Sequence, residues 1–80
     1  MGRTNLCTGR QLHAARVLAG LTQRDLASAV GVTERSVRRW EQHPDRKPVG
    51  KPNDLLIEEV LRQRGVLLIA SPAPGCRMTE

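Results

Sequence analysis

The sequence predicts a mainly α-helical fold, a bundle of four to five short helices followed by a short C-terminal β-hairpin. Apolar residues recur at helical spacing in four segments between residues 9 and 64, and glycines and prolines separate these segments. Only residues 66–70 form a continuous apolar run that is too short for a helix. A chain of 80 residues forms one small domain. We expect a flexible N-terminus over residues 1–8, the helical domain over 9–64 and a C-terminal arm over 65–80.

The first and last helices are predicted from their caps and breakers. The first helix should begin at Thr8 or Gly9 and run to about Ala19, with Gly20 ending it. Its expected apolar face is Leu12, Ala15 and Leu18. Residues 43–52 contain three prolines and a glycine, which predict a loop. Asn53 should then cap a last helix that starts at Asp54 and stops at Gly65, and its expected buried face is Leu56, Ile57, Val60 and Leu61.

Residues 21–42 contain the most informative pattern in the chain. Thr22 and Asp25 form a capping-box-like pair at the start of a second helix, and Gly31 suits the left-handed turn that would end it. Thr33 can cap a third helix that is rich in arginine. The expected inward side chains of the two helices are Leu26, Ala27, Val30, Val37 and Trp40, and the outward ones on the third are Glu34, Arg35, Arg38 and Arg39. Two short helices joined by a glycine turn, the second of them basic, predict a helix-turn-helix.

The charge of the chain agrees with a nucleic-acid partner. Lysine and arginine number 13 against 8 acidic residues, a formal net charge of +5 at pH 7, and all but Lys47 and Lys51 of the basic residues are arginines. Arginine suits both phosphate oxygens and guanine edges. Concentration of this charge on one helix therefore predicts double-stranded DNA as the partner. Trp40 is the only aromatic residue, so base stacking on single strands or structured RNA is disfavoured.

The pattern resembles the Cro and phage-repressor (XRE-type) helix-turn-helix regulators over about residues 9–64. The positions that carry the resemblance are Arg16, Gly20–Gln23, Leu26–Ala27, Gly31–Thr33, Ser36–Val37 and Trp40–Glu41. The tail from Gly65 through Arg77 is also similar to that of the small bacterial and phage members that end in a β-hairpin. The resemblance implies a lambda-repressor-like bundle that binds operator DNA as a two-fold dimer, usually to repress. Two departures stand out: the residues after Glu41 are Gln42-His43-Pro44, and the recognition helix is unusually rich in arginine.

Site residues follow from the helix-turn-helix prediction. Base edges should be contacted by the first turns of the third helix, where Arg35 and Arg39 can each take a guanine and Glu34 a cytosine amine. An equally supported alternative is that Glu34 only supplies the negative charge that is favourable at the N-terminus of a helix. The expected base contacts are Thr33, Glu34, Arg35, Ser36 and Arg39. The expected phosphate contacts are Arg10, Thr22, Gln23, Arg38, Gln42, Arg46, Lys47 and Lys51.

The resemblance further implies a structural pair between Arg16 and Glu41. In the family, an arginine at this place in the first helix pairs with the acid that closes the third helix. The family's glutamine at the position of Gln23 bonds a phosphate and braces the recognition helix.

The C-terminal arm is expected to mediate dimerisation. An isolated two-stranded hairpin is marginal in water, and an exposed apolar strand favours pairing with another chain. We expect the same element of a second subunit to complete the sheet. The alternative is that the arm folds back on the helices. The expected dimerisation residues are Val66, Leu67, Leu68, Ile69, Cys76 and Met78.

Other functions find little support in the sequence. Cys7, Cys76, His13 and His43 show no metal-ligand spacing, and no nucleophile or phosphate loop indicates an enzyme or a cofactor. We therefore expect a cytoplasmic protein without a membrane segment or a small-molecule effector. A DNA-binding antitoxin that contacts a toxin through the arm, and a protein-interaction adaptor that keeps the fold without DNA, remain alternatives.

Overall fold

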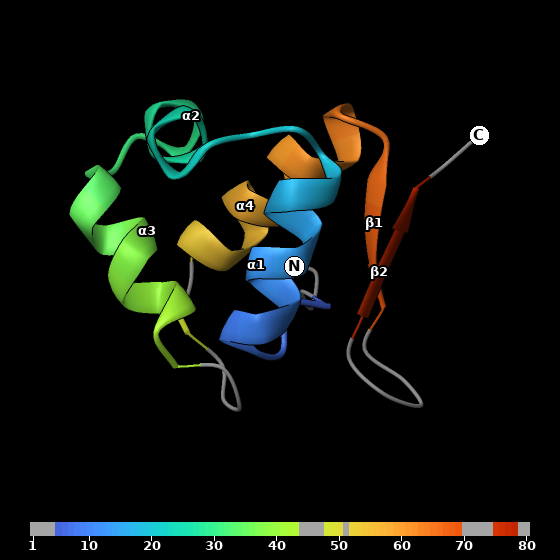
Figure 1. The fold of residues 1–80 in the computed structure, drawn as a ribbon, viewed down its shortest axis with the longest axis horizontal. Coiled ribbons are helices and arrows are strands. Elements are labelled where there is room, and N and C mark those ends of the chain that lie inside the picture. Colours follow the sequence, from blue (N-terminus) through green and yellow to red (C-terminus); the bar gives the residue numbers. More distant parts are fainter. Residues whose placement is uncertain (1–4, 44–47, 51, 70–74, 79–80) are drawn as a thin grey trace.

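The computed structural model describes residues 5–43, 48–50, 52–69 and 75–78. Its elements are α1 (Gly9–Leu18), α2 (Gln23–Val30), α3 (Glu34–Glu41), α4 (Asn53–Gln63), β1 (Val66–Ile69) and β2 (Gly75–Met78). Helix α3 lies at one end of the longest axis and the hairpin lies at the other, with α1 and α4 between them (Figure 1). The mainly helical fold with a short terminal hairpin is therefore confirmed.

Side-chain caps fix the first three helices where the sequence predicts them. The hydroxyls of Thr8, Thr22 and Thr33 each accept a hydrogen bond from a backbone N–H in the first turn. The carboxylate of Asp25 accepts a hydrogen bond from the N–H of Thr22, which completes the predicted capping box. Gly31 ends α2 with φ of 89°, a conformation in which a side chain would be strained. The short connection from α2 to α3 thus has a defined shape.

Helix α4 differs from the prediction in its start and in its buried face. Asn53 is the first helical residue rather than the cap, because the N–H of Asp54 already bonds to the carbonyl of Gly50. Leu56 is 45 % exposed, so its assignment to the core is wrong. The side facing the other elements carries Asp54, Ile57, Glu58 and Leu61, because α4 packs against both α2 and β1.

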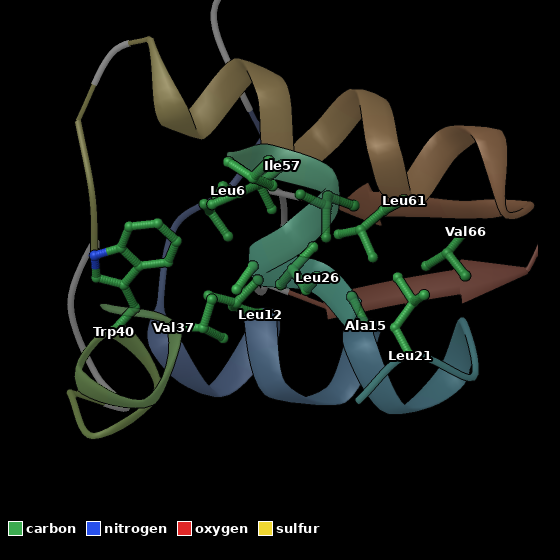
Figure 2. Close-up of a cluster of buried hydrophobic side chains, with 13 residues drawn as sticks. Leu6, Leu12, Ala15, Leu21, Leu26, Val37, Trp40, Ile57, Leu61 and Val66 are labelled. Carbon is green, nitrogen blue, oxygen red and sulfur yellow. The ribbon is translucent and has the colours of Figure 1, made fainter. Parts of the chain in front are cut away.

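The hydrophobic core joins the four helices and β1 (Figure 2), and Cys76 of β2 packs against it. Its members on the four helices are Leu12, Ala15, Leu26, Ala27, Val30, Val37, Trp40, Ile57 and Leu61. Leu18 is 40 % exposed and does not belong to this core, contrary to the prediction. Six residues of helix place Leu18 about 120° around the axis from Leu12, so both cannot face inward.

Residues 5–8, which precede α1, pack against the rest of the protein, so the predicted flexibility of this segment is wrong. Leu6 is 1 % exposed and belongs to the core. The buried amide of Gln11 donates to the carbonyls of Asn5, Ile69 and Gly75, and its oxygen accepts the N–H of Cys7. One side chain thereby joins the N-terminal segment to both strands. The remaining part of the predicted flexible N-terminus, residues 1–4, lies outside the described residues.

The hairpin folds back on the helices of its own chain. β1 and β2 pair antiparallel, with Val66 opposite Met78 and Ile69 opposite Gly75. Val66 and Leu68 point into the core, and β1 packs on α4 while β2 packs on α1. Because side chains alternate across a strand, Leu67 and Ile69 face the other way and are half-buried. The prediction that Val66 and Leu68 contact a second subunit is therefore wrong.

Gly9 allows an unusually close contact between α1 and the end of α3. Its N–H donates to the carbonyl of His43 at 3.2 Å, and a Cβ at this position would lie within 3.0 Å of the carbonyl oxygens of Trp40 and His43. We expect Gly9→Ala to lower the free energy of unfolding by about 1–3 kcal/mol, because rigid backbone must move to admit the methyl group. Urea denaturation measures this change. Gly50→Ala is the matched control, since a Cβ there meets nothing within 4 Å. Equal stability of the two variants would contradict the prediction.

Candidate nucleic-acid interface

The outer surface of α3 is a basic ridge. Val37 and Trp40 point into the core, which turns the side chains of Arg35, Arg38 and Arg39 outward into solvent. With Gln42 these three arginines line a shallow depression of about 330 Å³. Residues three and four apart are neighbours on a helix, so the guanidinium groups are presented together. Such a row of planar, permanently charged donors suits phosphate oxygens and guanine edges.

The first turn of α3 is held by its own hydroxyl groups. Thr33 Oγ1 accepts the N–H of Ser36 at 3.2 Å and lies 3.1 Å from Ser36 Oγ. Thr33 is exposed and Ser36 is half-buried. Both residues stand at the start of the helix, where the sequence predicts base contacts, and their hydroxyls bond to each other in the free protein.

Glu34 is engaged in two ion pairs on the surface between α2 and α3. Its Oε2 lies 3.4 Å from Arg38 Nη2 and its Oε1 lies 3.8 Å from Arg24 Nε. All three side chains are solvent-exposed to a substantial degree. Surface pairs of this kind contribute only about 0–1 kcal/mol to stability, so they exchange readily with other partners. The carboxylate lies at the end of the ridge where α3 begins.

Glu41 is the buried centre of a polar cluster behind α3, of which the outer member, His13, is 58 % exposed. The side chain of Glu41 is 6 % exposed, and that of its partner Arg16 is 11 % exposed. Arg16 Nε donates to Glu41 Oε2 at 2.6 Å and Nη2 donates to Oε1 at 3.1 Å, a two-point contact. Gln23 Nε2 donates to Oε1 at 3.2 Å, and His13 Nδ1 lies 2.9 Å from the same oxygen. Helices α1, α2 and α3 therefore meet at one carboxylate.

The charged form of Glu41 is favoured by this cluster. Burial raises the pKa of Glu41, but the hydrogen bonds from Arg16, His13 and Gln23 together outweigh it and hold that pKa below its ordinary value of 4.5. Arg16 also donates through Nη1 to the carbonyl of Leu21 at 2.9 Å. The same guanidinium thus fixes both the end of α3 and the connection between α1 and α2.

Sequence reasoning missed two members of this cluster. His13 precedes Arg16 by three residues and therefore lies on the same side of α1. That spacing is a signal that could have identified it. The backbone carbonyl of Leu21 carries no such signal, because only the folded path of the chain brings it to Arg16.

Residues 8–56 match the family model of a helix-turn-helix domain. The chain belongs to the helix-turn-helix family. The match spans α1, α2, α3 and the beginning of α4, and it includes the basic ridge. It is consistent with the XRE-type regulators that the sequence resembles. No curated protein and no solved structure matches the chain.

In this helix-turn-helix protein, α2 and α3 are the two helices of the motif, and α3 is the helix that enters a major groove in such domains. Arg10 is exposed in the first turn of α1, beside the end of α3, because Gly9 bonds to His43. Gln42 follows the last turn of α3. Thr22 uses its hydroxyl to cap α2, and Gln23 directs its amide to Glu41 rather than to solvent. The predicted phosphate contacts Arg46, Lys47 and Lys51 lie outside the described residues.

Among the described residues, no group of three or more His, Cys, Asp or Glu side chains is arranged to hold a metal ion. Cys7 and Cys76 are free and half-buried, and burial raises the pKa of the Cys76 thiol. Within the same part of the chain, no helix is long and apolar enough to cross a membrane.

Proposed function

We propose that this protein is a sequence-specific DNA-binding transcriptional regulator that represses by occupying a palindromic operator as a homodimer, with α3 in the major groove. The observation that carries the proposal is the row of exposed arginines on α3, whose opposite face packs into the core. A rigid basic helix of this kind can present side chains to base edges at fixed positions. A dimer bound at a promoter would exclude other proteins from the same DNA.

The base contacts of the proposed complex come from the exposed start and middle of α3. Arg35 and Arg39 each have the fork geometry to bind the O6 and N7 atoms of a guanine. Thr33 and Ser36 lie beside them, with hydroxyls that can exchange their mutual bond for a base or a phosphate. The phosphate contacts are proposed at the N-terminus of α2, where helix N–H groups favour an anion, and around the later turns of α3, with three more in the segments outside the described residues. They comprise Arg10, Thr22, Gln23, Arg38, Gln42, Arg46, Lys47 and Lys51.

Selection of binding sites from a random duplex pool tests this function. We expect a palindromic motif with guanines in each half-site, enriched at about 150 mM salt so that phosphate binding alone is suppressed. If about five phosphates are neutralised per protomer, the slope of log affinity against log salt should be about −4 to −5 per protomer. Binding that depends on salt without any enriched motif would contradict sequence-specific regulation. It would favour the adaptor alternative, in which a protein partner is primary.

The proposed dimer is supported by the outer face of the hairpin. Leu67 and Ile69 face away from the core. Met78 lies on the other face, opposite Val66, but it is 52 % exposed at the end of β2. In the described part of the chain the sheet has two strands only, so each strand has an edge that a second copy can extend. To read half-sites one turn apart on the same side of the duplex, the dimer must hold its two recognition helices about 34 Å apart.

Charging this face should separate the protomers. We expect the double variant Leu67→Lys and Ile69→Lys to be monomeric by light scattering at a concentration where the wild type is dimeric, because like charges would meet across the two-fold axis. The variant should keep its helical circular dichroism, since neither side chain belongs to the core. Leu56→Lys, at the exposed Leu56 on α4, is the control and should leave the dimer intact. A charged hairpin that still dimerises would place the interface elsewhere.

A further inference from the structure

The acidic residue at the start of the basic ridge has a role that the proposed function does not use. Helix α3 is described completely, and of its two acidic residues Glu41 is buried behind the helix. Glu34 therefore supplies the negative charge on the outer side. It has a separate oxygen for each of two arginines, Arg24 from α2 and Arg38 one turn further along α3.

These ion pairs oppose binding to any phosphate backbone. A guanidinium beside a carboxylate has part of its positive charge offset, so it attracts a phosphate less strongly than an unpaired guanidinium does. The carboxylate also stays close to the duplex and is repelled by it. Arg24 and Arg38 consequently contribute less to sequence-independent affinity than their exposure alone indicates. Arg35 and Arg39 have no such acidic neighbour among the described ion pairs, so their charge stays available.

We propose that Glu34 is a specificity-determining residue that holds Arg24 and Arg38 back from phosphates on non-cognate DNA. This inference rests on the proposed function, and it gives Glu34 a charge-balancing role in place of a hydrogen bond to cytosine. Non-cognate complexes rest on phosphate contacts alone, and the protein can shift on such DNA until freed arginines meet a phosphate. In a cognate complex the base contacts fix the position of α3 on the DNA. Arginines released from Glu34 therefore add less to the affinity for cognate DNA. Glu34 therefore weakens non-cognate binding more than cognate binding.

Neutralising Glu34 tests the inference. We expect Glu34→Gln to raise affinity for a duplex of scrambled sequence about 5-fold or more at about 150 mM salt, with a smaller gain on the selected site. The slope of log affinity against log salt should become steeper by about 0.9 for each phosphate that a freed arginine contacts. A merely structural role for Glu34 would not steepen this slope.

Three control variants isolate the local effect. Glu59→Gln removes the same charge from another exposed ion pair, the one that Glu59 forms with Arg62 at 2.9 Å on α4, and should leave the slope unchanged. Glu34→Asp keeps the carboxylate and should bind scrambled DNA nearly as weakly as the wild type does. Combining Glu34→Gln with Arg38→Gln should remove most of the gain, because Arg38 would no longer be present to bind a phosphate.

The outcomes separate this inference from the proposed function. If the wild type binds DNA and Glu34→Gln behaves as Glu59→Gln does, the role of Glu34 is overturned and the proposed function stands. If affinity rises equally for the selected and the scrambled duplex, Glu34 limits affinity without determining specificity, and the inference is also overturned. If neither the wild type nor the variant binds duplex DNA, the proposed function fails together with it.

Discussion

Replacing Glu41 with alanine should destabilise the fold by about 3–5 kcal/mol, the usual result of leaving one partner of a buried ion pair alone. Arg16 would keep its charge at a site where its side chain is 11 % exposed, and the carboxylate that joins three helices would be gone. Because α3 depends on that junction, DNA binding should be lost as a consequence of unfolding. Urea denaturation followed by circular dichroism measures the effect.

A matched control separates this cluster from ordinary surface pairs. Glu59→Ala removes a carboxylate that also bonds to an arginine, but both partners are more than half exposed on α4. We expect it to change stability by less than about 1 kcal/mol. A Glu41→Ala protein that melts near the wild-type temperature while failing to bind DNA would show that Glu41 acts at the interface and not in the fold.

The pH dependence of stability provides a second test of the same cluster. The pKa of Glu41 is lower in the folded protein than its ordinary value of 4.5, so the unfolded chain takes up the proton first as pH falls. The stabilisation is therefore fully present above about pH 5 and is lost as pH falls below 4.5 through the folded-state pKa. We expect the Glu41→Ala variant to lose less stability than the wild type over that acid range.

Replacing Arg35 and Arg39 together should abolish recognition of the selected operator. Each bidentate contact to a guanine is worth about 1–3 kcal/mol of discrimination, so Arg35→Gln with Arg39→Gln should remove most of the preference over scrambled DNA. Competition of the selected duplex against scrambled duplex, at one salt concentration, measures that ratio. Because both side chains are exposed on a helix anchored by Val37 and Trp40, the melting temperature should stay near the wild-type value.

The control for this loss is an arginine outside the ridge. Arg62→Gln removes the same kind of charge from α4, where Arg62 is paired with Glu59. It should weaken binding slightly on all sequences and leave the preference unchanged. If the Arg35 and Arg39 double variant also lost affinity equally on every sequence, those residues would be phosphate contacts and the specificity would have another source.

Local sequence signals were sufficient for the helix-turn-helix itself. Thr22, Asp25, Gly31 and Thr33 act through hydrogen bonds and backbone angles within a few residues, so their positions in the sequence fix their structure. Long-range packing decided the features that the sequence did not predict. The side of α4 that is buried depends on where α2 and β1 lie against it, which exposes Leu56. Only the folded chain brings Gln11 to the carbonyls of the hairpin.

The candidate site was predictable to a similar extent. The outward arginines of α3 follow from the helical spacing of Val37 and Trp40, which face the core. The hairpin contacts were harder to predict, because the outward residues of β1 are as apolar as the inward ones and the sequence shows no alternation between the two faces. Val66 and Leu68 were assigned to a second subunit although their own helices cover them. The partners of Glu34 were likewise hidden, since Arg24 belongs to a different helix.

Both ends of α3 are fastened to the rest of the protein. Its last turn contacts the backbone of Gly9 and carries Glu41 in the polar cluster, and its first turn follows the fixed connection at Gly31. A recognition helix held this rigidly cannot shift to fit the groove. The DNA must therefore change its shape to fit the helix. We therefore expect the affinity to depend on how readily the DNA bends or its groove narrows. Base pairs between the half-sites should then affect the affinity although no side chain contacts them.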